Sequence, residues 1–278
     1  MVEQQVIELD GFNKLVRGRD ALYLANENDV FVGRALILYG EYCQAEYELF
    51  DQLCPVGSFI AEIGANCGAH TVRLAKKVGL GGRVVAFEPQ PVVFQNLCGT
   101  ISLNSLMNVD CLPYGLAAEP GMLKIPALDY RQENNFGGIS IDQVSDGSIP
   151  VPIRRFDDVY RHDRLNFLKI DVEGMERDVL IGASASIAEH QPVIYIENDN
   201  QEKSPALISW LFEAGYKLWW HRPVLFNPDN YFQNATNIYG PTSSQNMLAI
   251  HSSIFADIAL PEITDIKDFP VVHKNFVP

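Results

Sequence analysis

The sequence predicts an α/β fold in which a mostly parallel β-sheet is covered by helices on both faces. From residue 59 onward, short apolar runs alternate with amphipathic segments of helical period, which is typical of consecutive βαβ units. The strand-like runs are apolar throughout, as expected for strands that are buried on both faces. With 47% apolar and 20% charged residues, the chain of 278 residues can also bury a sizeable core.

The first 50 residues precede this alternation. They mix short β-like runs (ALYLA, VFVG and ALILYG) with charged turns, and we interpret residues 1–50 as an N-terminal extension packed on the core. A helix is predicted at 46–53, where apolar residues recur at every third position. The main domain is expected at 51–251, followed by a C-terminal tail at 252–278.

The first half of the alternation contains three predicted strands, at 59–63 (FIAEI), 83–87 (RVVAF) and 109–112. Helices are predicted between them at 69–78 and 91–103. The first of these helices carries its apolar residues on one face, and it stops at the glycines of GLGG, which commonly end helices.

Residues 121–155 interrupt the alternation. The runs MLKIPAL, GGISI and IPVPI resemble short antiparallel strands separated by the polar stretch DYRQENNFGG, and they predict an inserted β-hairpin or lid. The alternation then resumes, with a long loop at 223–244 before the last strand. The remaining strands are predicted at 166–170, 193–197, 216–221 and 245–250, and the remaining helices at 175–188 and 205–214.

Composition excludes several classes of function. A net charge of −14 disfavours nucleic acid and anionic membranes as partners, because both need clustered Lys and Arg. The five cysteines are odd in number and include no CxxC pair, so we expect reduced thiols in a cytoplasmic compartment rather than disulfides or zinc. The chain shows neither a signal-peptide pattern nor an apolar run of about 18 residues, so no transmembrane segment is expected. The oligomeric state is left open, a homo-oligomer included.

The turn after the first strand of the alternation points to a cofactor. It reads Glu62-Ile-Gly64-Ala-Asn66-Cys-Gly68, and its glycines allow the backbone to turn sharply close to a ligand. A dinucleotide loop needs the spacing GxGxxG, whereas the spacing here is GxxxG with an acid before the first glycine. An acid repels a pyrophosphate and attracts an ammonium, which favours an amino-acid-bearing cofactor such as S-adenosylmethionine. The alternative is an ordinary glycine turn between a strand and a helix.

A second acid, Glu88, follows the next strand and lies 20 residues after Gly68. An acid at this place accepts hydrogen bonds from the two ribose hydroxyls in dinucleotide-binding folds. Two acids at the ends of consecutive strands favour one nucleoside ligand over two unrelated loop acids.

Further carboxylates follow the later strands. Asp171, Glu173 and Glu176 come directly after the strand 166–170. Glu176 suits the first turn of a helix, where it complements the helix dipole, but Asp171 and Glu173 have weaker structural explanations. Together with Glu197 and Asn198 after the following strand, Asp171 suggests an oxygen-rich Mg²⁺ site, similar to the metal site of catechol-type O-methyltransferases. The other reading is a polar turn that opens a helix.

These motifs together resemble the FkbM-type methyltransferases. The resemblance rests on Glu62-x-Gly64-x-Asn66-x-Gly68, on the FEP around Glu88 and on LKIDVEGME, and it extends to GEYCQAEYELF, Asn104 and RFDDVY. It implies a class I (Rossmann-like) methyltransferase fold, S-adenosylmethionine as cofactor, and O-methylation of a hydroxyl on a sugar, a glycan or a polyketide-type natural product. The sequence departs from the family at Glu62, where Asp is commoner, and at Cys67 and His70, where apolar or aromatic residues are usual.

The resemblance also implies roles for single residues. The methionine end of the cofactor is assigned to the turn after the first strand, and the ribose to Glu88 and its neighbour Pro89. Tyr114 and Gly115 are expected near the adenine. The residues assigned to the turn are Glu62, Gly64, Ala65, Asn66, Gly68 and Thr71, and Asp171 completes the cofactor set.

Removal of the acceptor proton requires a base, because a sugar hydroxyl is a poor nucleophile. Asp171 is the first candidate, Glu173 the second and His221 the third. The aromatic residues of the insertion and of the loop at 223–244, with Trp219 and Trp220, are expected around a small-molecule or glycan acceptor. Two other functions stay open: a metal-dependent O-methyltransferase acting on phenols, and a catalytically silent nucleotide-binding module.

Overall fold

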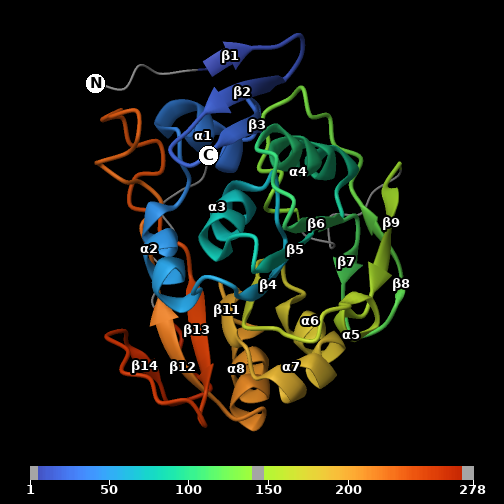
Figure 1. Cartoon of the computed structure of the whole chain (residues 1–278), viewed down its shortest axis with the longest axis vertical. Coiled ribbons are helices and arrows are strands. Elements are labelled where there is room, and N and C mark those ends of the chain that lie inside the picture. The colour runs from blue at the N-terminus through green and yellow to red at the C-terminus, as the bar shows by residue number, and fades with distance from the viewer. Residues whose placement is uncertain (1–5, 140–146, 271–278) are drawn as a thin grey trace.

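The central feature of the computed structural model is a large mixed β-sheet (Figure 1). The structure describes residues 6–139 and 147–270. In these residues the sheet has eight strands, in the spatial order β14 (Glu262–Ile263), β12 (Tyr216–His221), β13 (Asn246–His251), β11 (Val193–Glu197), β10 (Phe167–Ile170), β4 (Phe59–Ile63), β5 (Arg83–Phe87) and β6 (Val109–Leu112). The strands from β11 to β6 run parallel, whereas β13 pairs antiparallel with both β11 and β12. The predicted mostly parallel sheet is confirmed.

Helices cover both faces of this sheet, as predicted (Figure 1). On one face Ile60 of β4 packs with Phe50 and Leu74, which belong to α2 and α3. On the other face Ala61 packs in the same cluster as Leu180 of α6 and other residues of α6, α7 and α8. The helices are α1 (Val32–Tyr39), α2 (Gln44–Leu53), α3 (Ala69–Val78), α4 (Pro91–Leu103), α5 (Phe156–Val159), α6 (Glu176–Gly182), α7 (Ser184–His190) and α8 (Ser204–Glu213).

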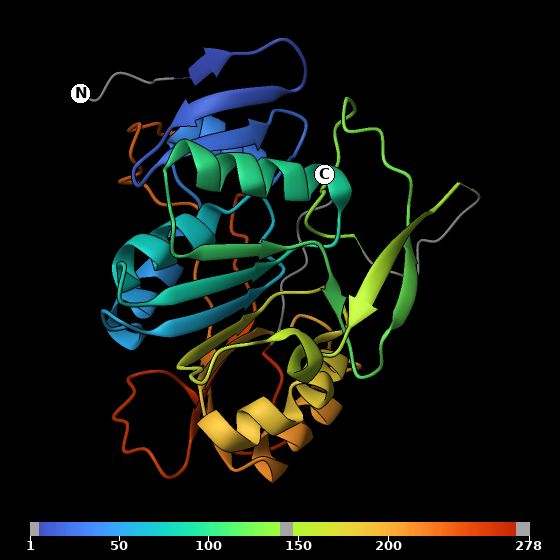
Figure 2. The same ribbon diagram turned by 45° about the vertical axis from the view of Figure 1, so that its right-hand side comes forward.

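The N-terminal extension forms a small sheet and a helix. Strands β1 (Val6–Glu8), β2 (Asn13–Arg17) and β3 (Leu22–Asn26) pair antiparallel, and β3 packs against α4 and α1. Figure 2 shows this small sheet, in dark blue, stacked on α4.

One prediction for the extension was wrong, because VFVG and ALILYG form the helix α1 instead of strands. A short apolar run fits a helix as well as a strand, so the ends decide. Here the Asp29 carboxylate accepts hydrogen bonds from the backbone N–H groups of Phe31 and Gly33, which satisfies the free donors at the start of the helix. Gly40, with φ of 69°, ends the helix in the left-handed conformation.

The helix predicted at 175–188 is divided into α6 and α7 at Ala183. A Cβ atom on Gly182 would lie 2.2 Å from the carbonyl oxygen of Ala117, so the chain approaches its neighbour too closely there for a larger residue. The Asp157 carboxylate accepts hydrogen bonds from the backbone N–H groups of Ala185 and Ser186, and thereby caps the start of α7.

The predicted insertion is a small separate sheet. Strands β8 (Gly121–Ile125) and β9 (Ile149–Arg154) form an antiparallel hairpin, and β7 (Gly115–Leu116) pairs parallel with β9. In Figure 2 the hairpin, in green and yellow-green, stands out from the body of the molecule. The end of the predicted run GGISI lies outside the described residues. Among the helices that the structure describes, none is long and apolar enough to cross a bilayer.

The turn after β4 passes directly against the end of β10. Gly64 has a φ of 85°, and a Cβ atom at this residue would lie 1.8 Å from the carbonyl oxygen of Asp171. Only glycine avoids both the left-handed strain and this overlap. The turn therefore joins the two strand ends that carry the predicted cofactor and acceptor residues.

Gly64→Ala is expected to lower the free energy of unfolding by at least about 3 kcal/mol, because the backbone at Asp171 must move. Gly240→Ala is the matched control: Gly240 also has a positive φ, of 57°, but no atom lies within 4 Å of the place that a Cβ atom would take. Left-handed strain alone costs about 1–2 kcal/mol there. Urea unfolding measures the free energy of unfolding of both variants. If Gly64→Ala and Gly240→Ala lost the same amount, the close approach of the two strand ends would be contradicted.

Candidate functional site

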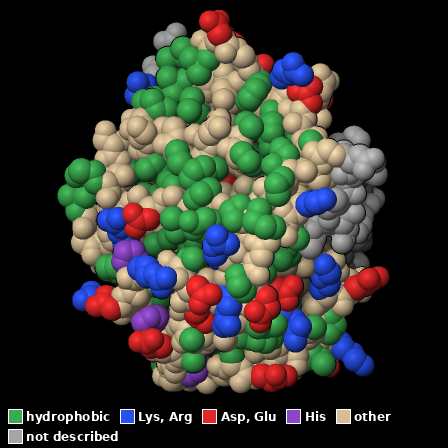
Figure 3. Space-filling view, turned by 90° about the vertical axis from the view of Figure 1, so that its right-hand side faces the viewer, with side chains coloured by type: hydrophobic (Ala, Val, Ile, Leu, Met, Phe, Trp, Pro, Cys, Tyr) green, Lys and Arg blue, Asp and Glu red, His purple; other side chains and the backbone are tan. Residues whose placement is uncertain are grey.

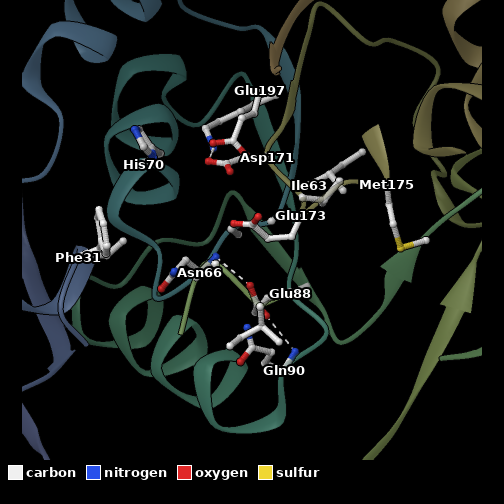
Figure 4. A pocket seen from close by; sticks show the side chains of 18 of the residues that line it. Phe31, Ile63, Asn66, His70, Glu88, Gln90, Asp171, Glu173, Met175 and Glu197 are labelled. Atoms are coloured by element: carbon white, nitrogen blue, oxygen red, sulfur yellow. Dashed lines mark hydrogen bonds and ion pairs between the residues drawn. The ribbon is translucent and has the colours of Figure 1, made fainter. Parts of the chain in front are cut away.

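A cavity of about 430 Å³ opens at the carboxyl ends of β4, β5, β10 and β11. Parallel sheets of this kind bind their ligands at this edge. The N-terminal extension contributes Phe31 and Val32 to its wall, and the segment before β13 contributes residues 242–245. Figure 4 shows labelled side chains around the cavity, with Asp171 and Glu197 at one end and Glu88 at the other.

Glu88 is held rigidly at the end of β5. Its carboxylate accepts hydrogen bonds from the backbone N–H groups of Asn66, at 3.0 Å, and Gln90, at 2.9 Å (Figure 4). Burial raises the pKa of Glu88 to about 7, although the two N–H groups oppose the shift. Asn66 adopts the left-handed conformation, with φ of 50°, which asparagine tolerates better than most residues. The carboxylate keeps free lone pairs that a ligand's hydroxyls can use.

Most of the predicted cofactor residues line this cavity, and three do not. Glu62, Gly68 and Thr71 lie beneath it. Thr71 Oγ1 donates a hydrogen bond to Glu62 Oε2 at 2.7 Å, and Gly68 caps the start of α3. The residues that line the cavity as predicted are Gly64, Ala65, Asn66, Glu88, Pro89, Tyr114, Gly115 and Asp171.

Glu62 does face an ammonium, but the ammonium belongs to Lys169. The two residues are register partners on the adjacent strands β4 and β10, and both are almost completely buried. Burial raises the pKa of Glu62, and the positive charge of Lys169 opposes this shift. Lys169 itself lines the cavity, and its Nζ lies 2.8 Å from Asp171 Oδ2.

Four carboxylates line the end of the cavity above β10 and β11, namely those of Asp171, Glu173, Glu197 and Asp199. Burial raises the pKa of Glu173 to about 7, and repulsion from Asp199 and Asp171 adds to the shift. Burial and the same two carboxylates raise the pKa of Glu197 well above its usual value. This end of the cavity therefore carries negative charge that a neutral or cationic ligand tolerates better than an anion.

The predicted metal ligand Asn198 is turned away from the cavity. Its amide nitrogen donates to Ser204 Oγ at 2.8 Å and to Met247 Sδ at 3.2 Å, in a buried position. Among the residues that the structure describes, no group of three or more His, Cys, Asp or Glu side chains is arranged to hold a metal ion.

Two other predicted groups also lie elsewhere. His221 is not among the described residues that line the cavity, and its Nδ1 lies 2.8 Å from the hydroxyl of Tyr195. Trp219 and Trp220 are buried on opposite faces of the sheet, in separate hydrophobic clusters. Aromatic rings reach the cavity instead from Phe31, Tyr42 and Tyr114.

Comparisons with known proteins identify the family. Residues 62–218, more than half of the chain, match the model of the methyltransferase FkbM domain. The chain belongs to the FkbM methyltransferase family. Enzymes of this family are S-adenosylmethionine-dependent methyltransferases, so S-adenosylmethionine is the cofactor of this protein.

Two fungal proteins are similar in sequence. Methyltransferase 1 of Beauveria bassiana (strain ARSEF 2860) is 27% identical over 189 residues, which cover 59% of this chain and 75% of that protein. Methyltransferase sdnD of Sordaria araneosa is 28% identical over 172 residues, which cover 49% of this chain and 66% of that protein.

Among solved structures, an FkbM methyltransferase from Methylobacillus flagellatus KT matches with a TM-score of 0.49 and 18% identity. The match covers 69% of this chain and 44% of that one, so the chain spans less than half the length of that protein. Aeropyrum pernix fibrillarin, in complex with natively bound S-adenosyl-L-methionine, matches with a TM-score of 0.45 and 14% identity over 90% of this chain and 100% of its own.

The residues of this FkbM protein fit the cofactor. A Cβ atom on Gly64 would overlap the carbonyl oxygen of Asp171, so only a glycine fits this wall, and the buried Glu88 carboxylate has acceptor positions that would suit ribose hydroxyls. Leu116 and Tyr114 offer apolar surface beside Glu88, where an adenine ring would pack.

Sequence reasoning assigned no role to three titratable residues that line the cavity, namely Glu46, Lys169 and His70. A signal was available for two of them. Lys169 interrupts the apolar run FLKI, and Glu46 lies four residues before Phe50 on the apolar face of its helix. A charge in a segment that must be buried indicates a buried partner or a function. Cys67 is explained differently, because it packs in a hydrophobic cluster with Val72 and Leu97.

Glu88→Gln is expected to weaken binding of S-adenosylhomocysteine by roughly tenfold or more, since a hydrogen bond to a charged group contributes about 1.5–3 kcal/mol. Wild-type affinity should rise by up to about tenfold from pH 6 to pH 8, because Glu88 loses its proton near pH 7 and gains acceptor capacity. Isothermal titration at both pH values measures this.

Comparison of the pH dependence of wild type and Glu88→Gln isolates the effect of Glu88. Glu173 and Glu176 also have a pKa of about 7, but both residues are present in the two proteins. Equal affinity of wild type and variant at pH 8 would show that Glu88 does not contact the ribose.

Proposed function

We propose that this protein transfers the methyl group of S-adenosylmethionine to a hydroxyl of a sugar, a glycan or a polyketide-type natural product. The observation that carries the proposal is that one wall of the cavity is acidic and another is apolar. Beside the cofactor residues, carboxylates from the ends of β10 and β11 face apolar side chains from the inserted sheet. Such a cavity suits a neutral ligand that has both hydroxyls and apolar surface.

The apolar wall comes from both strands of the hairpin. Its side chains are Leu123 and Ile125 of β8 and Val151 and Ile153 of β9. Outside the cavity the same hairpin exposes Met122 and Ile149. Figure 3 views the face that carries this hairpin, and hydrophobic side chains cover much of its upper and middle part, with charged side chains below. Apolar surface at this face supports an acceptor with a hydrophobic part.

The polar wall supports recognition of hydroxyls. Carboxylate oxygens accept hydrogen bonds from hydroxyl groups, and Asp171 and Glu173 are placed to do this beside the cofactor turn. The same charges repel a phosphate, so phosphorylated acceptors and nucleic acids fit poorly. The cofactor supplies a methyl group on a sulfonium, and catalysis by the protein then consists largely of positioning and proton removal.

We expect methyl transfer from labelled S-adenosylmethionine to neutral glycosides or polyketide alcohols, with the label in a methyl ether. Phosphorylated forms of the same acceptors should react at least about tenfold more slowly, because one like-charge contact of about 1.4 kcal/mol gives that factor. Mass spectrometry of the products measures both. Transfer only to phenols, only to nitrogen, or to no acceptor at all would contradict the proposal.

Chelation separates this proposal from a metal-dependent O-methyltransferase. Because the described residues form no metal-binding group, treatment with EDTA is expected to leave the rate of hydroxyl methylation unchanged. Loss of activity in EDTA, restored by added Mg²⁺, would favour the metal-dependent alternative. Asp171→Asn is the informative variant, since it would then also abolish the response to Mg²⁺.

A further inference from the structure

His70 and Glu46 form a buried pair in the wall of the cavity. His70 Nε2 lies 2.8 Å from Glu46 Oε2, and both side chains are at most 7% exposed. Both residues line the cavity. His70 lies in the first turn of α3, directly after the cofactor turn, whereas Glu46 comes from α2 in the N-terminal part of the chain.

The two nitrogens of the His70 ring have different surroundings. Nε2 is a buried atom whose contact with Glu46 is an ion pair rather than a hydrogen bond, and the described residues make no hydrogen bond to Nδ1. Tyr42, Tyr47 and Phe50 pack edge-on around the ring, at centroid distances of 5.8, 5.0 and 5.7 Å. The ring is therefore locked by packing, and Nδ1 is the nitrogen that the contact with Glu46 leaves available.

Glu46 is held in place by its own partner. Asn246 donates a hydrogen bond to Glu46 Oε1 at 2.7 Å, which leaves Oε2 for His70. The same amide nitrogen lies 2.8 Å from the hydroxyl of Tyr195, which in turn lies 2.8 Å from His221 Nδ1. The Glu46 carboxylate is thus fixed by Asn246 as well as by His70. Burial acts to raise the pKa of Glu46, but the contact with His70 and the charge of Lys169 outweigh burial and lower it.

A buried carboxylate at this point has a clear electrostatic use. The start of a helix carries positive partial charge, so an imidazolium in the first turn of α3 is disfavoured unless a negative charge faces it. Glu46 supplies that charge. The other charged and titratable groups around His70 are Glu62 of β4, Lys169 of β10, and the hydroxyls of Tyr42 and Tyr47.

The location within the cavity matches the reacting end of the cofactor. In Figure 4 His70 lies on the side of Asp171 and Glu197, away from Glu88, which we assign to the ribose. Asp171 is less suited to take a proton, because one of its oxygens is engaged by Lys169 at 2.8 Å. An imidazole matches a proton transfer near neutral pH better than a carboxylate does.

We propose that His70 is the general base that removes the proton of the acceptor hydroxyl, and that Glu46 orients it. The proposal rests on the proposed O-methylation. As the acceptor oxygen bonds to the methyl carbon, the carbon–sulfur bond breaks and its electron pair stays on sulfur. The hydroxyl proton passes to Nδ1 of His70. The products are a methyl ether, S-adenosylhomocysteine and an imidazolium that faces Glu46 and then loses its proton to solvent.

Kinetics of His70→Phe test the catalytic role, since phenylalanine keeps a ring among the three aromatic neighbours. With an acceptor that wild type methylates, kcat should fall by about 10²–10⁴-fold, while S-adenosylhomocysteine binds as in wild type. Glu46→Gln should also lower kcat, because the imidazolium that forms then has no negative charge facing it.

His162→Phe is the matched control. His162 also contacts an acid, with Nε2 3.6 Å from Asp110 Oδ2, but it packs on Phe59 at the opposite edge of the sheet. The His162→Phe variant should retain the wild-type kcat and its dependence on pH. Wild-type kcat in His70→Phe would overturn the proposal, and so would equal losses of kcat and of S-adenosylhomocysteine affinity, which would indicate a role in cofactor binding.

A second readout does not depend on turnover. Nitrogen-15 NMR of the full chain with S-adenosylhomocysteine bound, at pH 8, should show the His70 proton on Nε2 and a bare Nδ1. A proton on Nδ1 would overturn the proposal, because the nitrogen facing the cavity would then have no lone pair to offer. If wild type methylates no hydroxyl acceptor, the proposed function fails, and the tautomer still decides the geometry of His70.

Discussion

The ammonium group of Lys169, buried in the middle of the sheet, is the constraint on which the rest of the site depends. Its side chain is 2% exposed, and an uncompensated ion in such a place costs several kcal/mol. Three carboxylates oppose this cost: Asp171 at the strand end, Glu62 on the adjacent strand and Glu46 on the covering helix. Each of these acids is therefore tied to an internal charge before any ligand binds.

This requirement explains how carboxylates that look alike in sequence take different roles. Glu62 is the register partner of Lys169 within the sheet, whereas Glu88 is held by two backbone N–H groups in the cavity wall. Glu46 must close over the sheet, which brings α2 against α3 and encloses His70. The positive charge of Lys169 on β10 thus positions α2, which lies more than 100 residues earlier in the sequence.

The site also depends on segments outside the family domain. Glu46 precedes residue 62, where the family match begins, and Asn246 follows residue 218, where it ends. Their hydrogen bond connects α2, which carries Glu46, to the antiparallel strand β13, which carries Asn246. The part of the cavity that holds His70 is therefore assembled by these flanking segments.

The sequence by itself determined the alternation of strands and helices. This alternation also indicated where to look for residues of the site, namely directly after the carboxyl ends of the strands. Gly64, Glu88 and Asp171 were found in this way, because the carboxyl ends of parallel strands converge at one edge of the sheet. The short apolar run that forms α1 and the break between α6 and α7 could not be found, since both depend on contacts made at the ends of the segments.

Only the tertiary structure decided which side chains at that edge face the cavity and which face one another. Periodicity along the chain shows that Lys169 and Glu46 are buried, but not that they share one electrostatic neighbourhood, because the contact joins elements that are distant in sequence. For the same reason His221, at a strand end like the others, is not among the residues that line the cavity, whereas His70 lines it with one nitrogen paired to Glu46.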